Sequence, residues 1–508
     1  MCSRSLCATF SGYSLICVWT GILFFQNNSA RFAWDNFSFQ LGMTIFLCVA
    51  LWLIGIGAAV APSWIWPQWS VTRAFSVWII GIFLVFVHDA IRYLLKDKFH
   101  LTELPSQGVY LLTVILTLIL VWLTSCFGPC RWLLSMAAAL LTLISLGSLM
   151  PLAWNHLGGY NESEKLPDGV QMTGERRLNN VYYVILDSYG GASALRKHLQ
   201  YDISSFLEKM TSLGYINISS ARTNYTATYV SLAATLNMEY ILNEESRRYL
   251  DRSNLFPSLL YQTRPPALTR VFQSKGYNFI HIGNGWAPCL PANGILCLPY
   301  MQQTSFQDIF TRYLAPTRLV QVYQRIQGTG GMADIDALTP FSKAVEDIAT
   351  QSKPSFVFVH HLIPHEPRHI DCTRSYNDLS EDEYKNSIEC TNRSVVALAE
   401  RIYKADPDAI VVFQADHGSG FQANWKSPLV AWTNSAVDER RSILNLVHIP
   451  VSCQKWVRQD LSPINTTRLV LACLDGRAPE YLVERTYLVA YELSPDFGLV
   501  RDVTNLVP

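Results

Sequence analysis

The chain has 508 residues, of which 50% are hydrophobic and only 16% are charged, and it contains 14 tryptophans. This length exceeds what one ordinary hydrophobic core accommodates, so we expect two or more structural units. The composition lies between that of a soluble enzyme and that of a membrane protein, which predicts a hybrid of the two. The 40 basic and 40 acidic residues give no net charge, which argues against a nucleic-acid partner attracted by a global field.

The first part of the chain is a series of apolar stretches, each near the ~20 residues that cross a bilayer core. Five of them precede residue 155, and we expect each to form a transmembrane helix: residues 7–25, 41–61, 74–91, 109–127 and 132–154. Buried core helices are the alternative for the series, and a signal peptide is the alternative for its first member. We therefore predict a membrane anchor at 1–154, a polar linker at 155–180 and a second domain at 181–508.

The cysteines of the second domain bear on its location. They form three pairs of sequence neighbours, namely Cys289 with Cys297, Cys372 with Cys390, and Cys453 with Cys473. Pairs in short loops are typical of disulfides and of an oxidising compartment. The basic residues that flank the apolar stretches do not favour either orientation clearly. We therefore expect an integral inner or plasma membrane protein whose second domain lies on the extracytoplasmic, periplasmic side.

The second domain alternates between short apolar runs and helical patterns. Continuous runs of β-forming residues predict strands buried on both faces at 181–186, 278–282, 356–360 and 409–413. Helical periodicity occurs at 203–213 and at 391–404. Such alternation predicts an α/β domain with a mostly parallel central sheet covered by helices on both faces. Ligands of such sheets bind outside the carboxyl ends of the strands.

Carboxylates follow two of these predicted strands. Asp187 comes directly after the first strand, and Asp416 with His417 follows the last one within a Gly-rich segment. Carboxylate oxygen and imidazole nitrogen together are ligands that suit zinc or manganese. A helix cap at Asp187 and a plain turn at Asp416 and His417 are the alternatives. Their joint position at two strand ends favours a metal site.

Two further segments carry candidate catalytic groups. The segment 222–231 (RTNYTATYVS) opens a helical run, and its hydroxyls are either helix caps or groups that face a phosphate. A metal that binds a threonine oxygen would make it a nucleophile. His360 and His365 follow a predicted strand and are candidates for phosphate binding, for leaving-group protonation or for a second metal. His361 is the weaker candidate, because strand alternation points it away from His360.

This combination resembles the sulfatase-type branch of the alkaline phosphatase superfamily. With the apolar helices, it is similar to membrane phosphoethanolamine transferases and lipoteichoic acid synthases, and to uncharacterised bacterial sulfatase-like membrane proteins. The resemblance implies an alkaline-phosphatase-like fold, a zinc or manganese ion and a threonine nucleophile. It assigns the metal ligands to Asp187, Thr226, Asp416 and His417 and catalytic roles to Thr226, His360 and His365.

The resemblance leaves the nucleophile open between two threonines. The spacing of the phosphoethanolamine transferases favours Thr226, whereas the pattern of the uncharacterised sulfatase-like group falls on Thr228. The chain also departs from the family, because the usual Asp-His-Gly-Glu continuation ends in Ser419 here. True sulfatases carry a Cys or Ser in a C/S-x-P-x-R segment, and this sequence has none. That absence disfavours sulfate-ester hydrolysis by a formylglycine nucleophile.

We therefore expect a metal-dependent enzyme that transfers a phosphoryl-linked head group, of the phosphoethanolamine or phosphoglycerol type. The donor would be a membrane lipid, the acceptor an envelope lipid or glycan, and the intermediate a phosphothreonine. A phosphodiesterase, phosphatase or sulfatase-like hydrolase that uses the same site is the first alternative. A non-catalytic envelope binding protein is the second. The sequence does not indicate an oligomeric state.

Overall fold

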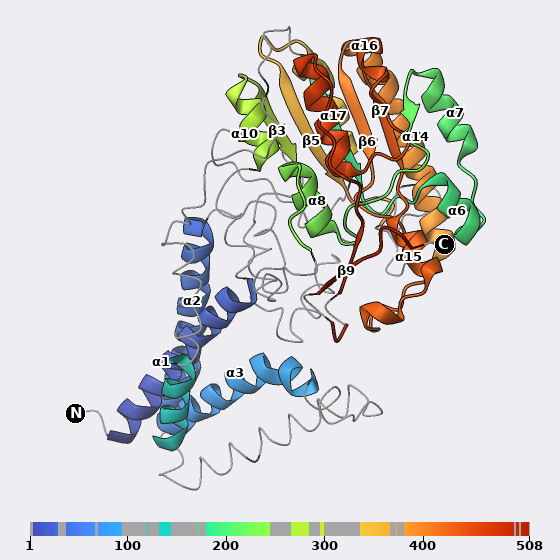
Figure 1. The fold of residues 1–508 in the computed structure, drawn as a ribbon. Coiled ribbons are helices and arrows are strands. Elements are labelled where there is room, and N and C mark those ends of the chain that lie inside the picture. Colours follow the sequence, from blue (N-terminus) through green and yellow to red (C-terminus); the bar gives the residue numbers. More distant parts are fainter. Residues whose placement is uncertain are drawn as a thin grey trace. The chain divides into compact units, whose positions relative to one another are not determined.

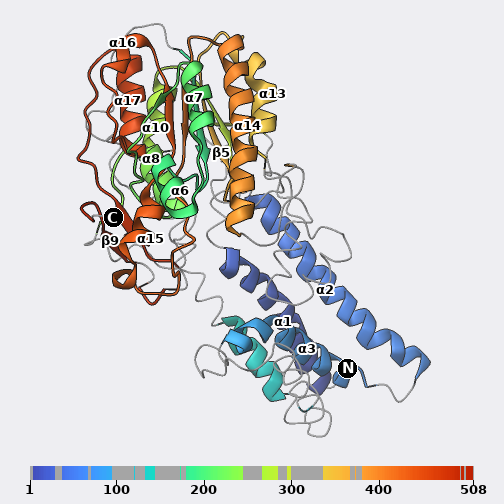
Figure 2. The ribbon, with the colours of Figure 1, turned by 90° about the vertical axis from the view of Figure 1, so that its right-hand side faces the viewer.

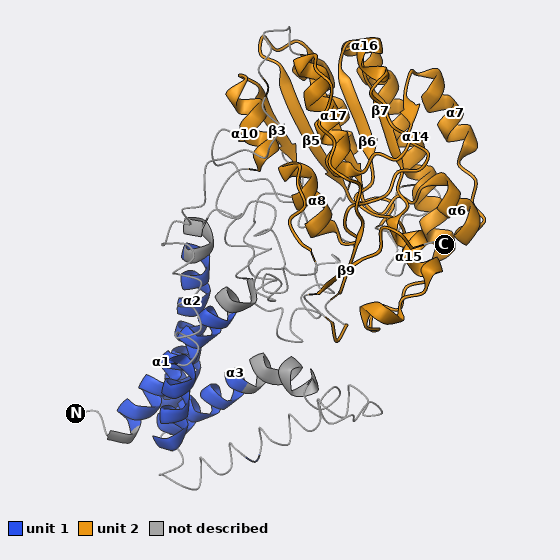
Figure 3. Ribbon diagram, viewed as in Figure 1, with its two compact units in different colours: residues 1–160, 304–330 blue, residues 161–303, 331–508 orange. Residues whose placement is uncertain are grey.

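The structure is a computed structural model that describes residues 4–28, 37–66, 70–93, 119, 132–143, 172, 179–243, 266–283, 295–298, 336–365, 372, 380–491, 494–496 and 499–506. The described residues up to 143 belong to one compact unit, and those from 172 onward belong to a second (Figure 3). The expected division into an anchor at 1–154, a linker at 155–180 and a domain at 181–508 stays a prediction.

The first unit is helical and apolar. Its long helices are α1 (Arg4–Asn28), α2 (Phe37–Ile65) and α3 (Val71–Tyr93). Tyr13 of α1 lies in their shared core, where its ring is 5.2 Å from that of Phe75 and its hydroxyl donates to the carbonyl of Leu51 at 2.6 Å. This hydrogen bond satisfies a polar group that apolar surroundings would otherwise penalise.

Two segments of this unit are long and apolar enough to cross a membrane, Leu6–Leu23 and Gly42–Ile65, and they coincide with the first two predicted spans. The described parts of the third and fifth predicted spans contain the shorter apolar helices Val71–Phe83 and Trp132–Leu143. The predicted span 109–127 lies outside the described residues apart from Ile119. The total of five transmembrane helices therefore stays a prediction.

The second unit is built on a mixed, mostly parallel sheet of seven strands in the order β2-β7-β6-β1-β5-β3-β4. Strand β1 pairs in parallel with β5 and β6, β3 pairs in parallel with β4 and β5, and β7 runs antiparallel to β6 and β2. The strands are β1 (Val181–Leu186), β2 (Ile216–Asn217), β3 (Asn278–Ile282), β4 (Ile295–Cys297), β5 (Ser355–His361), β6 (Ile410–Gln414) and β7 (Asn445–His448).

The central strands are the ones whose sequences are continuously apolar. All residues of β1, β5 and β6 are buried, because helices cover both faces of this part of the sheet. Tyr183 and Phe358 of neighbouring strands stack with ring centroids 6.3 Å apart. The four predicted strands correspond to β1, β3, β5 and β6 to within two residues at each end. The sequence did not predict β7, because its four residues (NLVH) give too short a pattern.

Helices cover both faces of the sheet, as predicted (Figures 1 and 2). One face carries α8 (Thr228–Asn237), α10 (Ala267–Ser274) and α17 (Pro463–Asp475), and the other carries α7 (Ser204–Ser212), α13 (Leu338–Ala349) and α14 (Glu381–Ala405). Helix α14 begins ten residues before the predicted start, because Ser380 and Glu383 form a capping box. The remaining elements are α6 (Ala192–Leu199), the 3-10 helix η5 (Leu429–Ala431), α15 (Asn434–Arg441), α16 (Val451–Gln454), and the hairpin of β8 (Tyr487–Val489) and β9 (Val500–Asp502).

Two of the predicted disulfides are present in the second unit. Cys372 is bonded to Cys390, and Cys453 is bonded to Cys473. Cys297 is also disulfide-bonded, and Cys289 lies outside the described residues. Cys7 and Cys17 of the first unit, by contrast, are free thiols. This distribution is typical of a domain that folds in an oxidising compartment.

Replacing Cys453 and Cys473 together by serine is expected to lower the free energy of unfolding. The disulfide closes a loop with a sequence separation of 20 residues, for which loss of the crosslink costs about 3 kcal/mol through the unfolded chain. Urea unfolding of the detergent-solubilised protein, followed by tryptophan fluorescence, measures this change. Serine at Cys7, a thiol of the first unit, is the control, and an equal effect of that substitution would contradict the assignment.

Candidate functional site

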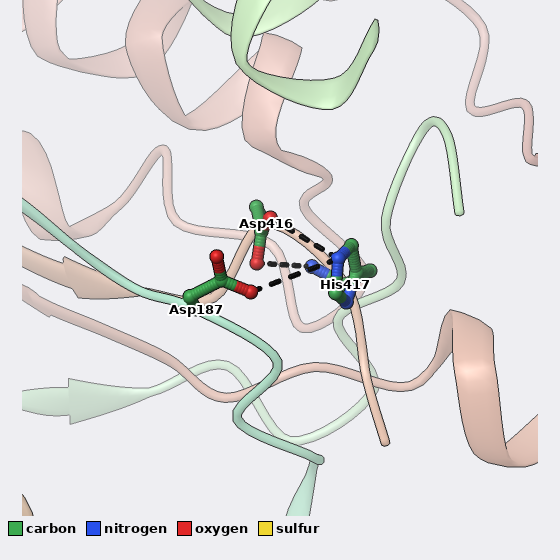
Figure 4. Close-up of side chains that lie close together, drawn as sticks. All are labelled: Asp187, Asp416 and His417. Atoms are coloured by element: carbon green, nitrogen blue, oxygen red, sulfur yellow. Dashed lines mark hydrogen bonds and ion pairs between the residues drawn. The ribbon is translucent and has the colours of Figure 1, made fainter. Parts of the chain in front are cut away.

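Two carboxylates and an imidazole meet at one edge of the sheet. Because β1 and β6 are adjacent and parallel, their carboxyl ends lie side by side, so Asp187 after β1 faces Asp416 and His417 after β6 (Figure 4). One ligand atom from each of the three residues lies within 4.8 Å of the others. All three side chains are buried. The sequence predicted this grouping from the strand ends alone.

The electrostatics of the two carboxylates suit a divalent cation. Asp416 Oδ1 accepts hydrogen bonds from the backbone N–H groups of Ser188 at 3.0 Å and His417 at 2.9 Å. Its second oxygen is buried and accepts no hydrogen bond from the residues that the structure describes. Burial and the neighbouring Asp187 carboxylate raise the pKa of Asp416 to about 7. A bound cation would lower this pKa again. Its positive charge compensates for the lost solvation and for the repulsion between the two carboxylates.

His417 presents its Nε2 atom to the two carboxylates. Its Nδ1 lies 3.1 Å from the carbonyl of Gly418, which can only accept, so Nδ1 carries the proton and Nε2 carries the lone pair. Nε2 lies 3.3 Å from Asp416 Oδ2 and 3.8 Å from Asp187 Oδ1. Burial and the Arg440 cation hold the pKa of His417 well below its usual range. The imidazole is therefore in the neutral form that binds metals.

The two candidate threonines have different surroundings. Thr228 is the first residue of α8, and its hydroxyl lies 2.9 Å from His417 Nε2. The hydroxyl of Thr226 instead accepts a hydrogen bond from the backbone N–H of Val489 at 2.9 Å. The carbonyl of Thr226 accepts from Arg440 and Tyr491. Thr226, favoured by the sequence, thus anchors its loop to β8, whereas the alternative Thr228 faces the candidate metal ligands.

His360 and His361 of β5, and His365 after it, have different surroundings. His360 Nε2 is 3.2 Å from Asp187 Oδ2, so this side chain belongs to the site. Burial lowers the pKa of His360 to about 4 and also lowers that of His365. The backbone N–H of His365 donates to the carbonyl of Asp187 at 3.1 Å. His361 instead faces α13, where its Nδ1 accepts from the N–H of Ala337 at 3.3 Å.

Arg440 is a site residue that the sequence did not reveal. Its guanidinium is buried, lies 3.0 Å from His417 Nε2 and donates to the carbonyls of Thr226 at 3.0 Å and Gly418 at 2.8 Å. Trp425 packs against it, with the guanidinium 5.0 Å from the ring centroid. Arg440 belongs to the run 438–441 (DERR) of α15, and a run of four charged residues ordinarily indicates a solvated face. No feature of the local sequence distinguishes this buried run from an exposed one.

The sulfatase family profile matches residues 179–443, which is just over half of the 508 residues and includes every candidate site residue. The chain belongs to the sulfatase family. Its resemblance to the sulfatase-type branch of the alkaline phosphatase superfamily is thereby confirmed, and the protein is a sulfatase-like enzyme. No curated protein matches this member of the sulfatase family.

Solved structures similar to this sulfatase-family chain include transferases and a sulfatase candidate. The periplasmic domain of EcEptC from Escherichia coli, in complex with zinc, is 13% identical with a TM-score of 0.43, and the match covers 67% of this chain and 98% of that one. The phosphoethanolamine transferase EptA of Neisseria meningitidis is 11% identical with a TM-score of 0.42, covering 89% and 95%. The sulfatase candidate yidJ of Bacteroides fragilis is 15% identical with a TM-score of 0.39, covering 63% and 83%.

The affinity of the site for zinc is expected to rise with pH up to about pH 7 and then to level off. The pKa of Asp416 near 7 means that a proton must leave before a cation binds, which costs about tenfold in affinity per pH unit below that value. His417 stays neutral over this range because its pKa is lowered. Zinc titration of the chelator-treated protein against a competing dye, from about pH 5 to about pH 8, measures the slope.

Asp416→Asn is the matched variant, because asparagine keeps the shape of the side chain and cannot titrate. It should bind zinc more weakly, and the pH dependence below neutrality should flatten. An unchanged slope in this variant would show that another group releases the proton.

Proposed function

We propose that the protein transfers a phosphoryl-linked head group, of the phosphoethanolamine or phosphoglycerol type, from a membrane lipid to an envelope lipid or glycan. The reaction would pass through a phosphothreonine on Thr228. The observation that carries this proposal is the Thr228 hydroxyl, 2.9 Å from His417 Nε2 beside two buried carboxylates. Few other arrangements bring a hydroxyl nucleophile and a candidate ligand set into one buried site.

Each residue of the site has a proposed role in the transfer. Asp187, Asp416 and His417 would hold a zinc or manganese ion, which when bound supplies the positive charge that favours the threonine alkoxide. Thr228 Oγ1 forms a bond to the donor phosphorus, and the bond from phosphorus to the lipid oxygen breaks. The departing lipid oxygen takes up a proton. The acceptor hydroxyl then attacks the same phosphorus, loses its proton and releases Thr228.

Three side chains around the ligand set would assist these steps. Arg440 adds a fixed positive charge beside His417, which favours an anionic phosphate ester. His360 and His365 have lowered pKa values, so they are neutral near pH 7 and would first bind phosphate oxygens. Negative charge on the substrate raises the pKa of a nearby imidazole, which prepares either histidine to protonate the leaving group. We propose both roles for His360 and His365. The same two histidines are also the proposed site of a second metal.

The remaining features support a lipid donor and an extracytoplasmic site. Segments Leu6–Leu23 and Gly42–Ile65 are apolar enough to cross a membrane, and α2 exposes Ile45, Phe46 and Leu53 by more than half, as side chains that face lipid do. The disulfides suit the periplasmic side of the membrane. The missing C/S-x-P-x-R segment favours phosphate over sulfate esters.

The proposal predicts a covalent adduct on Thr228. The purified full chain, loaded with zinc and incubated with vesicles of phosphatidylethanolamine or phosphatidylglycerol, should gain the mass of one head-group phosphate on the peptide that contains Thr228. Thr228→Ala should abolish the adduct and lower turnover on the order of 1,000-fold or more, as removal of a nucleophile does. Intact-protein and peptide mass spectrometry identifies the residue.

Two controls separate chemistry from folding. Thr228 is not the cap of α8, because Ala227 holds that position, so Thr228→Ala leaves the helix start intact. Thr226→Val removes the other hydroxyl and should keep the adduct. An adduct on Thr226 would restore the assignment favoured by the sequence. Release of free head-group phosphate to water, without transfer to an added lipid or glycan acceptor, would identify the enzyme as a hydrolase.

A further inference from the structure

A further buried carboxylate binds the segment that follows His417. Glu439 of α15 is 1% exposed, and its side chain accepts three hydrogen bonds from residues 419–422. Oε1 accepts from the hydroxyl of Ser419 at 2.8 Å and from the N–H of Phe421 at 2.9 Å. Oε2 accepts from the N–H of Gln422 at 2.9 Å. A buried charge is costly unless it is hydrogen-bonded in this way, so the carboxylate and the segment depend on each other.

The segment that Glu439 holds follows directly on Gly418, the residue whose carbonyl orients His417. The carbonyl of Gly418 accepts from His417 Nδ1 at 3.1 Å, from Arg440 at 2.8 Å and from the Ser188 hydroxyl at 3.0 Å. The N–H of Gly418 donates to the carbonyl of Arg440 at 2.7 Å. A Cβ at position 418 would lie 2.2 Å from the carbonyl oxygen of Glu439, so only glycine permits this approach to α15.

Ser419 is the first residue of the segment that Glu439 contacts, and its hydroxyl donates to Glu439, which is 20 residues further along the chain. The carboxylate that contacts the segment just after His417 is therefore supplied by α15.

We propose that Glu439 is a positioning residue for the metal site: it fixes residues 418–422 so that the Gly418 carbonyl holds the His417 ring with Nε2 toward Asp187 and Asp416. The inference rests on the metal site of the proposed function. Groups that orient a ligating histidine through its other ring nitrogen affect metal affinity about 10- to 100-fold. Glu439 acts on the His417 ring less directly, through the backbone of residues 418–422.

The test compares zinc affinity with stability in the full-length, detergent-solubilised protein. Glu439→Gln keeps the size of the side chain, but an amide has one acceptor oxygen, so at least one of the three donors loses its partner. Zinc titration against a competing dye should show a dissociation constant raised about tenfold. Ser419→Ala removes only one of the three hydrogen bonds and should give a smaller increase. This milder variant keeps the test valid if Glu439→Gln does not fold.

Asp406→Asn is the matched control. Asp406 is another carboxylate with hydrogen bonds to described side chains, Asn180 at 2.7 Å and Tyr182 at 2.8 Å, but it lies at the opposite end of β1. The Asp406→Asn substitution should lower the midpoint temperature of unfolding of the metal-free protein and leave its zinc affinity unchanged. A merely structural Glu439 would behave in the same way, and that result would overturn the inference.

The outcomes also separate this inference from the proposed function. If the wild-type protein binds zinc and Glu439→Gln and Ser419→Ala bind it equally well, only the positioning role of Glu439 is wrong. If the wild-type protein binds neither zinc nor manganese, the metal site of the proposed function fails and the inference fails with it. Weaker binding in both variants, with wild-type binding in Asp406→Asn, supports the inference.

Discussion

The parallel pairing of β1 between β5 and β6 is the constraint on which the site depends. Each of these strands is apolar along its length and buried on both faces, so hydrophobic burial specifies their place at the centre of the sheet. Parallel pairing then requires that all three end at the same edge. The polar residues at these ends, Asp187 after β1, His360 within β5 and Asp416 after β6, therefore lie close together.

The proximity of the Asp187 and Asp416 carboxylates has an energetic cost, because two buried negative charges repel each other. Burial and, after it, the neighbouring Asp187 carboxylate raise the pKa of Asp416 to about 7, so the shift reflects lost solvation as well as this repulsion. A carboxyl whose folded pKa exceeds its unfolded value adds stability only while it is protonated, and this contribution is lost as the pH rises through about 7. In the absence of a cation, the site is therefore a weak point of the fold near neutral pH. The hydrogen bonds that reach the site from α15, through Glu439 and Arg440, counteract that weakness.

The sequence predicted the framework well, because burial leaves a clear pattern. The runs that became β1, β3, β5 and β6 are short, apolar and bounded by polar residues, so both their existence and their carboxyl ends could be found. β7 was missed because its four residues, two of them polar, form no periodic pattern. Helices α7 and α14 were predicted from their periodicity and a helical run was expected where α8 begins, whereas no helix was predicted at α10, α13 or α17. The start of α14 was misplaced, since its first turns carry polar residues that mask the periodicity.

The site itself was only partly predictable, for a different physical reason. Residues adjacent to strand ends could be identified because secondary structure places them. The choice between Thr226 and Thr228 depends instead on tertiary contacts: Val489 of β8 binds one hydroxyl, and His417 faces the other. Glu439 and Arg440 depend on how α15 packs against the segment after His417. Contacts of this kind leave no periodic signal in the sequence.

Strand β8 and Tyr491 hold one side of the site, although they lie far along the chain from the loop that they contact. Asp187, His360, Asp416 and His417 are all translated before β8, yet the loop of Thr226 is fixed by Val489 and by the hydroxyl of Tyr491. A chain without these residues would lack the contacts that hold the loop of Thr226. The nucleophile side of the site therefore depends on residues 489 and 491, whereas all the candidate metal ligands precede them in the sequence.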